Sequence, residues 1–446
     1  MSADGPVGAN SPAPVDWARV APTARPDAQR VVVTGMGMVS ALGPDVAATF
    51  EAAARAESGI ARLTRFDPTG LPCDIGGEID LDALDAAEPE DEIGGSAWHL
   101  LRTAARQAGA VHLAAPIADR RRVAVILGGH GCTPLKENYV HAARYVDEQG
   151  RVNLEGLARD ARYDRRQGLR RSPDTAPLLL ARLIDARGPV LPIVSACAAG
   201  TQAIGEGLRL IRDGRADVVV VGGTEPLLVY TYVVGFALLG ALTRRYASPE
   251  TASRPFDRKR NGFVIAEGAG VLVLERLDGA KARGREVLGE VLGYGDSADA
   301  FRITDPHPEG RGALAAIRGA LRDASVHPHD IGYVNAHGTS TAMNDPIESA
   351  ALEKALGEAV AHVPVSSNKS MLGHAIGAAG AIEAILTFEG MRRGVVLPTR
   401  NLDAPDRKCR LDYVPHEARS HEHAIALSNS FGFGGQNGCL CLGRGA

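Results

Sequence analysis

The sequence predicts an α/β fold that consists of two similar halves. Eight short apolar runs have the length and composition of strands buried on both faces, and helix-like stretches separate many of them. These runs are residues 31–33, 123–127, 218–221, 271–274, 331–335, 363–366, 424–427 and 439–442. Buried strands that alternate with helices are typical of layered α/β proteins. The second observation is that one strand–turn–helix unit occurs twice.

The repeated unit consists of a strand, a tight turn and a helix rich in small residues that ends at a glycine. The first copy covers residues 192–214 and the second covers residues 363–394. Each copy carries one reactive side chain near the predicted start of its helix, Cys197 in the first and His374 in the second. Two copies are too few for a repeat array. Packed back to back, they would bring the two helix starts together.

Composition and charge argue against several classes of function. The chain has 446 residues, 45% of them hydrophobic, and a net charge of −4, so nothing indicates the basic face typical of nucleic-acid-binding proteins. No apolar run approaches the roughly 18 residues of a membrane-spanning helix. None of the six cysteines forms a CxxC pair, which favours a reduced, cytoplasmic protein without a disulfide framework or a metal site.

The expected domain organisation follows the repeat. Residues 1–29 are rich in Pro, Ala and Asp and are expected to form a disordered tail. The N-terminal half, residues 30–285, begins with a buried strand that we expect to stop at the glycine turn of residues 34–37. It includes a charged excursion from the core at about residues 135–176. The C-terminal half is residues 286–446.

Cys197 is the first candidate for chemistry. It lies between an apolar strand and an Ala/Gly-rich helix, where the helix macrodipole favours a thiolate. We therefore expect a lowered thiol pKa. Unpaired backbone N–H groups at the helix start would face a developing oxyanion. The alternative interpretation is a buried structural cysteine, which is the usual state of an isolated one.

Two histidines lie in glycine-flanked turns that follow predicted strands. His337 precedes Gly338, and His374 follows Gly373. Sites in α/β sheets are usually built at the carboxyl ends of strands, so a cysteine and two histidines in this setting indicate one site. The glycine-rich segment 429–437 is either a plain hairpin loop or a loop that donates a backbone N–H to substrate and gates a pocket with an aromatic ring.

Taken together, these segments resemble the β-ketoacyl-acyl-carrier-protein synthases, the ketosynthases of fatty acid and polyketide assembly. The resemblance covers the chain from Arg30 to about Gly443. It rests on Val32-Val33-Thr34-Gly35-Met36-Gly37, Ser195-Ala196-Cys197, Arg254-Pro255-Phe256-Asp257, Glu267-Gly268-Ala269-Gly270, Asn335-Ala336-His337-Gly338-Thr339-Ser340-Thr341, Asn368-Lys369-Ser370, Gly373-His374 and Asn429-Ser430-Phe431-Gly432-Phe433-Gly434-Gly435. The order and spacing of these motifs together are highly specific.

The resemblance implies a duplicated thiolase-like fold with five layers, α-β-α-β-α, and mixed sheets. It implies that Cys197 is the nucleophile that takes an acyl group from a carrier-protein or coenzyme A thioester. His337 and His374 would stabilise the enolate formed when a malonyl extender loses carbon dioxide. The resulting product is a β-ketoacyl thioester. The N–H groups of Cys197 and Phe433 would form the oxyanion hole.

The resemblance also implies roles for neighbouring residues, a partner and an assembly. Supporting roles fall to Lys369 and Glu348, pantetheine or substrate binding to Thr339, Thr341, Phe236, Phe431 and Phe433, and contact with acyl carrier protein to Arg170 and Arg171. We expect no metal, no prosthetic group and a homodimer. Departures from the family pattern, such as Ala198-Ala199-Gly200 after the nucleophile and Ala266 before Glu267, suggest a diverged member from specialised, polyketide-type metabolism.

Three alternatives share the fold but differ in chemistry. An acyltransferase or cyclase would act on a bound chain without extension. A catalytically inactive chain-length partner of a heterodimer typically lacks the cysteine, so Cys197 argues against it. A biosynthetic thiolase usually has a second cysteine near the C-terminal glycine loop, where this chain has Phe431-Gly432-Phe433-Gly434-Gly435.

Overall fold

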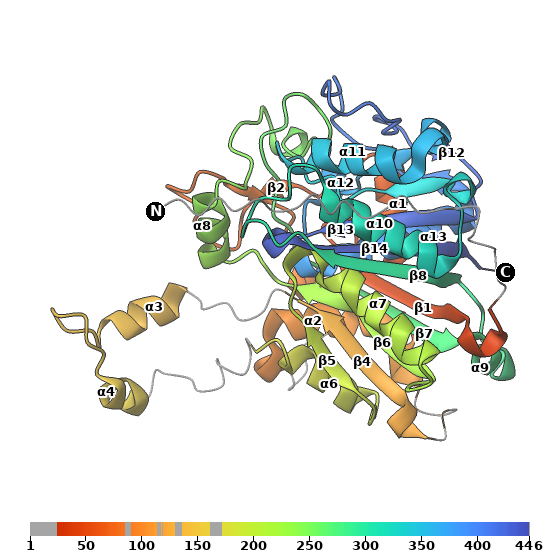
Figure 1. Cartoon of the computed structure of the whole chain (residues 1–446). Coiled ribbons are helices and arrows are strands. Elements are labelled where there is room, and N and C mark those ends of the chain that lie inside the picture. Colours follow the sequence, from red (N-terminus) through yellow and green to blue (C-terminus); the bar gives the residue numbers. More distant parts are fainter. Residues whose placement is uncertain are drawn as a thin grey trace, which may run out of the picture.

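The computed structural model describes residues 25–84, 91–113, 117, 119–129, 136–160 and 172–445. Its main strands in the first half of the chain are β1 (Val31–Ser40), β4 (Val123–Gly128), β5 (Val190–Ile193), β6 (Val218–Glu225) and β7 (Gly268–Arg276). Those in the second half are β8 (Gly289–Ala298), β9 (Tyr333–Asn335), β10 (Val365–Ser366), β13 (Ile425–Phe431) and β14 (Gln436–Arg444). All ten belong to one mixed sheet in the order β10-β9-β13-β14-β8-β1-β7-β6-β4-β5. The part of this order from β13 to β5 can be followed in Figure 1.

The sheet consists of two equivalent sets of five strands. In the first set β1 pairs with β7 and β7 with β6 in antiparallel fashion, and the pairs β6–β4 and β4–β5 are parallel. In the second set β8 pairs with β14 and β14 with β13 in antiparallel fashion, and the pairs β13–β9 and β9–β10 are parallel. The two sets meet where β1 and β8 pair briefly, at Val32 and Val33. The duplication predicted from the repeated unit is therefore confirmed.

Helices cover both faces of each five-stranded set and so produce five layers. The central helices are α7 (Ala199–Arg212) and α13 (Ile376–Arg393), and the outer ones are α2 (Asp91–Gln107), α6 (Thr175–Leu183), α10 (Arg311–Ala324) and α11 (Asn344–Leu356). Val219 and Val221 of β6 pack toward the central helices, whereas Val218 and Val220 pack toward α2 and α6. On the other side of the molecule α10 and α11 pack on β9 and β14. In Figure 1 α11 lies at the top and α6 at the bottom.

Shorter elements connect these layers. The helices are α1 (Val46–Ala54), α3 (Lys136–Ala143), α4 (Leu154–Arg159), α8 (Tyr230–Leu238), α9 (Leu277–Ala282) and α12 (Lys369–Leu372). The short strands are β2 (Ala61–Arg62), β3 (Ile75–Gly76), β11 (Val395–Val396) and β12 (Arg419–Ser420). Helices α3 and α4, which belong to the predicted excursion, lie apart from the layered body in Figure 1. None of the helices in the described ranges is both long and apolar enough to cross a membrane.

The two central helices cross at small residues. A Cβ atom added at Gly200 of α7 would lie 2.9 Å from the carbonyl oxygen of Gly377, and one at Gly380 of α13 would lie 2.7 Å from the amide nitrogen of Thr201. Larger side chains would keep the helices apart. This close crossing brings the N-terminal ends of α7 and α13 together, as the repeat predicts.

The prediction of a turn at residues 34–37 is wrong. Strand β1 continues through these residues, with a bulge between Val33 and Gly35. A Cβ at Gly35 would lie 2.0 Å from the carbonyl oxygen of Ala108, and one at Gly37 would lie 2.1 Å from that of Ala104. The glycines therefore allow the C-terminal end of α2 to pack directly on the strand. Glycine within a strand often marks such a close approach of another backbone.

Residues 25–29, which were expected to belong to the disordered tail, are structured. Asp27–Gln29 form a 3-10 helix, and Arg25 donates a hydrogen bond of 2.5 Å to the carbonyl oxygen of Asp323. The rest of the predicted tail, residues 1–24, lies outside the described residues. The same is true of Arg170 and Arg171, so their predicted contact with a carrier protein stays a prediction.

Candidate active site

Three sequence-distant side chains meet at one end of the central helices. Cys197 lies in the 3-10 turn Ala196–Ala198 that leads into α7, His374 lies between α12 and α13, and His337 lies two residues after the end of β9. The Sγ atom of Cys197 is 3.1 Å from Nε2 of His374. The two imidazole centroids are 5.4 Å apart. The structure thus brings together the cysteine and both histidines that the sequence singles out.

The local backbone directs N–H groups at the cysteine sulfur. The N–H groups of Phe433 and of Cys197 itself are both directed at Sγ. Gly432 makes this possible, because a Cβ there would lie 3.1 Å from the Cys197 nitrogen. Ala196 has a φ of 49°, a strained conformation of the residue that precedes the nucleophile. These are the two N–H groups predicted to form the oxyanion hole, and that role stays a prediction.

The prediction of a lowered thiol pKa is wrong. Burial raises the pKa of the Cys197 thiol to about 12, although Lys369 acts in the opposite direction. The side chain is surrounded by apolar groups, including Ile376 and Phe263, in one buried cluster. Removing water from the thiolate destabilises it more than the helix start and the charge of Lys369 stabilise it. At neutral pH the sulfur is therefore a thiol, and its proton must leave during reaction.

His337 is held by its backbone and kept neutral by its surroundings. Its N–H donates a 2.7 Å hydrogen bond to Glu348, and its carbonyl oxygen accepts one of 2.7 Å from Nζ of Lys369. Burial, followed by the positive charge of Lys369 and the proximity of His374, holds the pKa of His337 well below its ordinary value. A neutral imidazole has one N–H to offer to a substrate oxygen.

Glu348 binds only donors. Its carboxylate accepts from the N–H of His337 at 2.7 Å, that of Gly338 at 2.8 Å, the amide of Asn429 at 3.1 Å and that of Asn344 at 3.3 Å. Burial raises the pKa of Glu348 to about 7, and the two backbone donors oppose this rise. Glu348 therefore orients the turn that carries His337, in keeping with its predicted supporting role.

Lys369 forms a buried ion pair with Glu383, a residue that the sequence analysis missed. Both side chains are 2% exposed, and Nζ of Lys369 bonds to the Glu383 carboxylate. Asn335 and Asn368 extend this polar cluster, with 3.1 Å between their side-chain amides. A signal was available, because Glu383 interrupts a helix whose other neighbours are small or apolar. A carboxylate inside such a helix needs a cationic partner.

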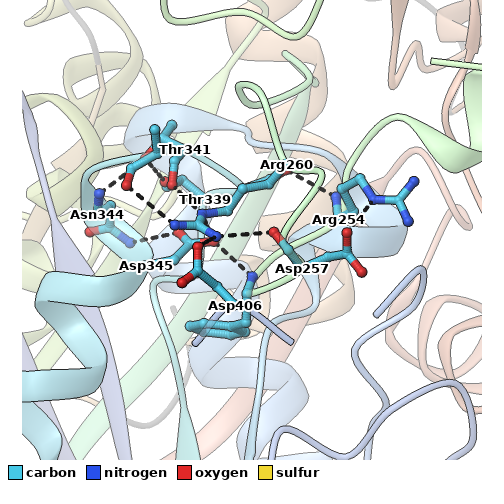
Figure 2. Close-up of polar contacts among 12 residues, drawn as sticks. Arg254, Asp257, Arg260, Thr339, Thr341, Asn344, Asp345 and Asp406 are labelled. Atoms are coloured by element: carbon cyan, nitrogen blue, oxygen red, sulfur yellow. Dashed lines mark hydrogen bonds and ion pairs between the residues drawn. The ribbon is translucent and has the colours of Figure 1, made fainter. Parts of the chain in front are cut away.

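A cavity of about 440 Å³ connects the three side chains with the surface. Its inner wall includes Thr339, Phe431 and Phe433, and its outer part reaches the exposed side chains of Leu239 and Met343. Thr341 also lines it, and the hydroxyl oxygens of the two threonines are 2.9 Å apart. Figure 2 shows this threonine pair and the polar network beneath it.

Phe236 lies one layer behind this cavity. Its ring stacks on that of Phe433 with 6.2 Å between centroids and meets Phe263 edge-on at 5.5 Å. Phe431 contacts the ring of His337 edge-on at 5.9 Å. Two of the three phenylalanines predicted to bind substrate therefore line the cavity, and the third supports one of them.

The same three side chains carry metal-ligand chemistry. One ligand atom each of Cys197, His337 and His374 lies within 4.8 Å of the other two. Sulfur and imidazole are ligands that Zn²⁺ accepts. Because a ligating cysteine must lose its proton, the high pKa of this thiol works against such a site. We keep the expectation that these groups act directly on substrate.

Two protein-family models together match most of the chain. The beta-ketoacyl synthase N-terminal domain matches residues 28–280, and the beta-ketoacyl synthase C-terminal domain matches residues 288–403. The chain is 40% identical over 428 residues to the 3-oxoacyl-[acyl-carrier-protein] synthase 2 of Rhizobium meliloti, covering 93% of this chain and 99% of that protein. It is 38% identical over 424 residues to the protein of the same name from Synechocystis sp., covering 93% and 98%.

A solved structure has the same architecture. It is that of a type II polyketide synthase acyl-carrier protein in complex with its ketosynthase bound to the hexaketide, AntDE:AntF. The match has a TM-score of 0.81 and 31% sequence identity, and it covers 94% of this chain and 99% of the other.

Proposed function

The chain belongs to the β-ketoacyl synthase family and is an acyltransferase of the ketosynthase type, and from this premise we propose which of its residues perform the condensation. The proposal is that Cys197 accepts an acyl group from a carrier-protein or coenzyme A thioester. A malonyl-type extender then loses carbon dioxide and attacks the acyl group to give a β-ketoacyl thioester. The observation that carries this proposal is the contact of 3.1 Å between the Cys197 sulfur and Nε2 of His374 inside a cavity that reaches the surface.

The first step is acyl transfer to Cys197. Because the pKa of the thiol is raised to about 12, Nε2 of His374 takes the proton as Sγ attacks the thioester carbonyl. The proton then passes to the thiolate of the departing arm. The N–H groups of Cys197 and Phe433 stabilise the oxyanion. Thr339 and Thr341 offer hydroxyls to the pantetheine arm, and Phe431 and Phe433 line the cavity beside the acyl group.

The second step is decarboxylation of the extender and formation of the carbon–carbon bond. For this step His374 changes tautomer, so that Nε2 carries the ring proton. His337 and His374 then donate hydrogen bonds to the thioester carbonyl of the malonyl group, so the enolate forms as carbon dioxide departs. The enolate carbon attacks the acyl carbonyl on Cys197, the bond from that carbonyl to the Cys197 sulfur breaks, and the released thiolate takes up one proton from solvent, which replaces the carboxylate charge lost with carbon dioxide. Lys369 and Glu348 act on the position and protonation of His337. No prosthetic group or metal takes part in this proposal.

Acyl carrier protein is the proposed partner, and Arg170 and Arg171 are its predicted contacts. The solved complex of a similar ketosynthase with its carrier supports this partner. We also propose a homodimer. Strand β5 lies at the edge of the sheet, with Leu191 41% exposed and Val194, just beyond it, 54% exposed, so an apolar edge is available to a second copy. We also propose that the protein is cytoplasmic, because a free thiol nucleophile needs a reducing environment.

The test separates condensation from its alternative. Purified protein is incubated with an acyl-carrier thioester, and the mass of the intact chain is measured. We expect an acyl adduct that Cys197→Ala abolishes. Malonyl-carrier protein labelled in the free carboxyl is then added, and release of labelled carbon dioxide together with a β-ketoacyl product is expected. An adduct without carbon dioxide release would favour transfer or cyclisation, and no adduct would refute the role of Cys197.

A further inference from the structure

The two threonines that face the cavity belong to a strained segment, residues 338–343, which lies between β9 and α11. Within it, Ser340 has a φ of 67°, a conformation that residues other than glycine rarely adopt. Such a conformation persists only where its surroundings hold it. The hydroxyls of Thr339 and Thr341 can serve a substrate arm only while this segment keeps its shape.

A second segment, residues 254–262, holds the first through hydrogen bonds. The N–H of Arg254 donates to Oγ of Ser340 at 3.0 Å, and the N–H of Gly262 donates to the carbonyl oxygen of Ser340 at 3.0 Å. The N–H of Phe256 donates to Asp345 at 2.8 Å. These are backbone donors, and one side chain of this segment adds further hydrogen bonds to the backbone of the strained turn.

That side chain is Arg260. Its guanidinium donates to the carbonyl oxygen of Thr341 at 2.8 Å and to that of Ala342 at 3.3 Å, and it also donates to the Asp406 carboxylate at 2.8 Å. Nε lies 3.7 Å from the carboxylate of Asp345, which also accepts a hydrogen bond from the N–H of Thr339. Figure 2 shows Arg260 amid these partners.

The charge of Arg260 is almost completely buried. Its side chain is 4% exposed, that of Asp345 is fully buried and that of Asp406 is 27% exposed. The guanidinium also donates to the carbonyl oxygen of Asp257 at 3.0 Å, and a buried cation with a planar fork that serves three carbonyl groups and two carboxylates fixes geometry as well as charge. A lysine has a single nitrogen and cannot serve these partners at once.

We infer that Arg260 is a positioning residue for the substrate arm, one that holds Thr339 and Thr341 in place and thereby sets the affinity for thioesters with a full phosphopantetheine arm. It does not act on the chemistry at Cys197. The N–H of His337 is held by Glu348, which has three further donors of its own and needs nothing from Arg260. The inference rests on the proposed function, because it assumes a pantetheine thioester in this cavity.

The experiment compares two acyl donors with the same acyl group. Hexanoyl-CoA carries the whole arm, and S-ethyl thiohexanoate carries only its terminal sulfur and two carbons, without its amides, hydroxyl or phosphate. Acylation of Cys197 is followed by intact-protein mass spectrometry over a range of donor concentrations. For Arg260→Gln we expect the hexanoyl-CoA concentration of half-maximal rate to rise about tenfold. The acylation rate with S-ethyl thiohexanoate should stay within about twofold of wild type.

Three further variants make the result decisive. Arg260→Lys should recover only part of the loss, and Arg258→Gln, a change at an exposed neighbouring arginine, should behave as wild type. Asp406→Asn removes a partly exposed partner of Arg260 and should shift the hexanoyl-CoA concentration about threefold in the same direction. This variant decides the question if Arg260→Gln does not fold.

The inference is overturned by an equal loss with both donors, or by hexanoyl-CoA concentrations within twofold of wild type for the Arg260 and Asp406 variants. Failure of the proposed function would look different. In that case wild-type Cys197 would take up no acyl group from either donor, whereas rejection of this inference leaves the wild-type protein acylated by both.

Discussion

The buried pair of Lys369 and Glu383 allows a quantitative prediction. Both side chains are 2% exposed, and besides Glu383 the ammonium group has the carbonyl oxygen of His337 as an acceptor at 2.7 Å. Glu383→Gln keeps the size of the side chain and removes its charge. The lysine is then left as a buried cation with only neutral acceptors. Breaking a buried pair in this way costs about 3–5 kcal/mol, a large part of the 5–15 kcal/mol typical of folded domains.

The assay is urea-induced unfolding at pH 7.5, with the loss of helical circular dichroism as the signal. We expect Glu383→Gln to lower the free energy of unfolding by about 3–5 kcal/mol. Glu358→Gln, a change at an exposed glutamate, should stay within about 0.5 kcal/mol of wild type. A Lys369→Met/Glu383→Leu double variant should lose less than the single one, because no unpaired charge remains. A loss below about 1 kcal/mol for Glu383→Gln would refute this reasoning.

The lysine of this pair also affects the protonation of His337. The charge of Lys369 is one of the causes that hold the pKa of His337 well below its ordinary value, after burial. Lys369→Met removes that charge, so the pKa of His337 should rise. Because decarboxylation as proposed needs the neutral imidazole, activity is lost as the pH falls through this pKa. The acidic limb of the pH–rate profile should therefore move to higher pH, and an unmoved limb would contradict the assigned role.

Three further predictions concern separate parts of the molecule. Burial raises the pKa of Glu348 from 4.5 to about 7, so the protein should lose about 3 kcal/mol of stability as the pH rises from 4.5 to 7. In urea unfolding measured across this range, Glu348→Gln should lack this loss, and a variant whose stability changes with pH in parallel with wild type would contradict the prediction. With a pKa of about 12, Cys197 should react with iodoacetamide about tenfold faster for each pH unit up to pH 9. If the rate measured by mass spectrometry instead reached a plateau below pH 8, the raised pKa would be refuted. Gly35→Ala should lower the free energy of unfolding by at least about 2 kcal/mol because its Cβ would overlap a helix carbonyl, whereas Gly235→Ala, in open space on α8, should stay within about 1 kcal/mol.

Much of the fold and of the site follows from local patterns in the chain. Strands buried on both faces appear as continuous apolar runs, which is why β4 and β6 were recognisable. The repeated strand–turn–helix unit predicted the duplication. It also placed Cys197 and His374 at equivalent helix starts, because both features depend on residues close together in sequence. The motif around His337 added the third group, and the resemblance to ketosynthases, now shown by the family match, rested on the order of these motifs.

Other properties depend on which distant residues become neighbours. Glu383 was missed because only the packing of α13 against the turn after β10 makes it the partner of Lys369. The wrong turn at Gly35 has the same origin, since nothing near it in sequence announces that the end of α2 packs on β1. Strand β8 was missed because its residues alternate between buried and partly exposed positions and form no continuous apolar run.

The sequence by itself determined which groups could react, because the chemistry of a thiol or an imidazole and the start of a helix are local. Tertiary structure alone decided the state of those groups. The pKa of Cys197 depends on how many apolar neighbours exclude water from the sulfur, and several of them, such as Ile376 and Phe263, come from distant segments. Desolvation is a property of the complete packed environment, so a helix-start argument alone gave the wrong sign.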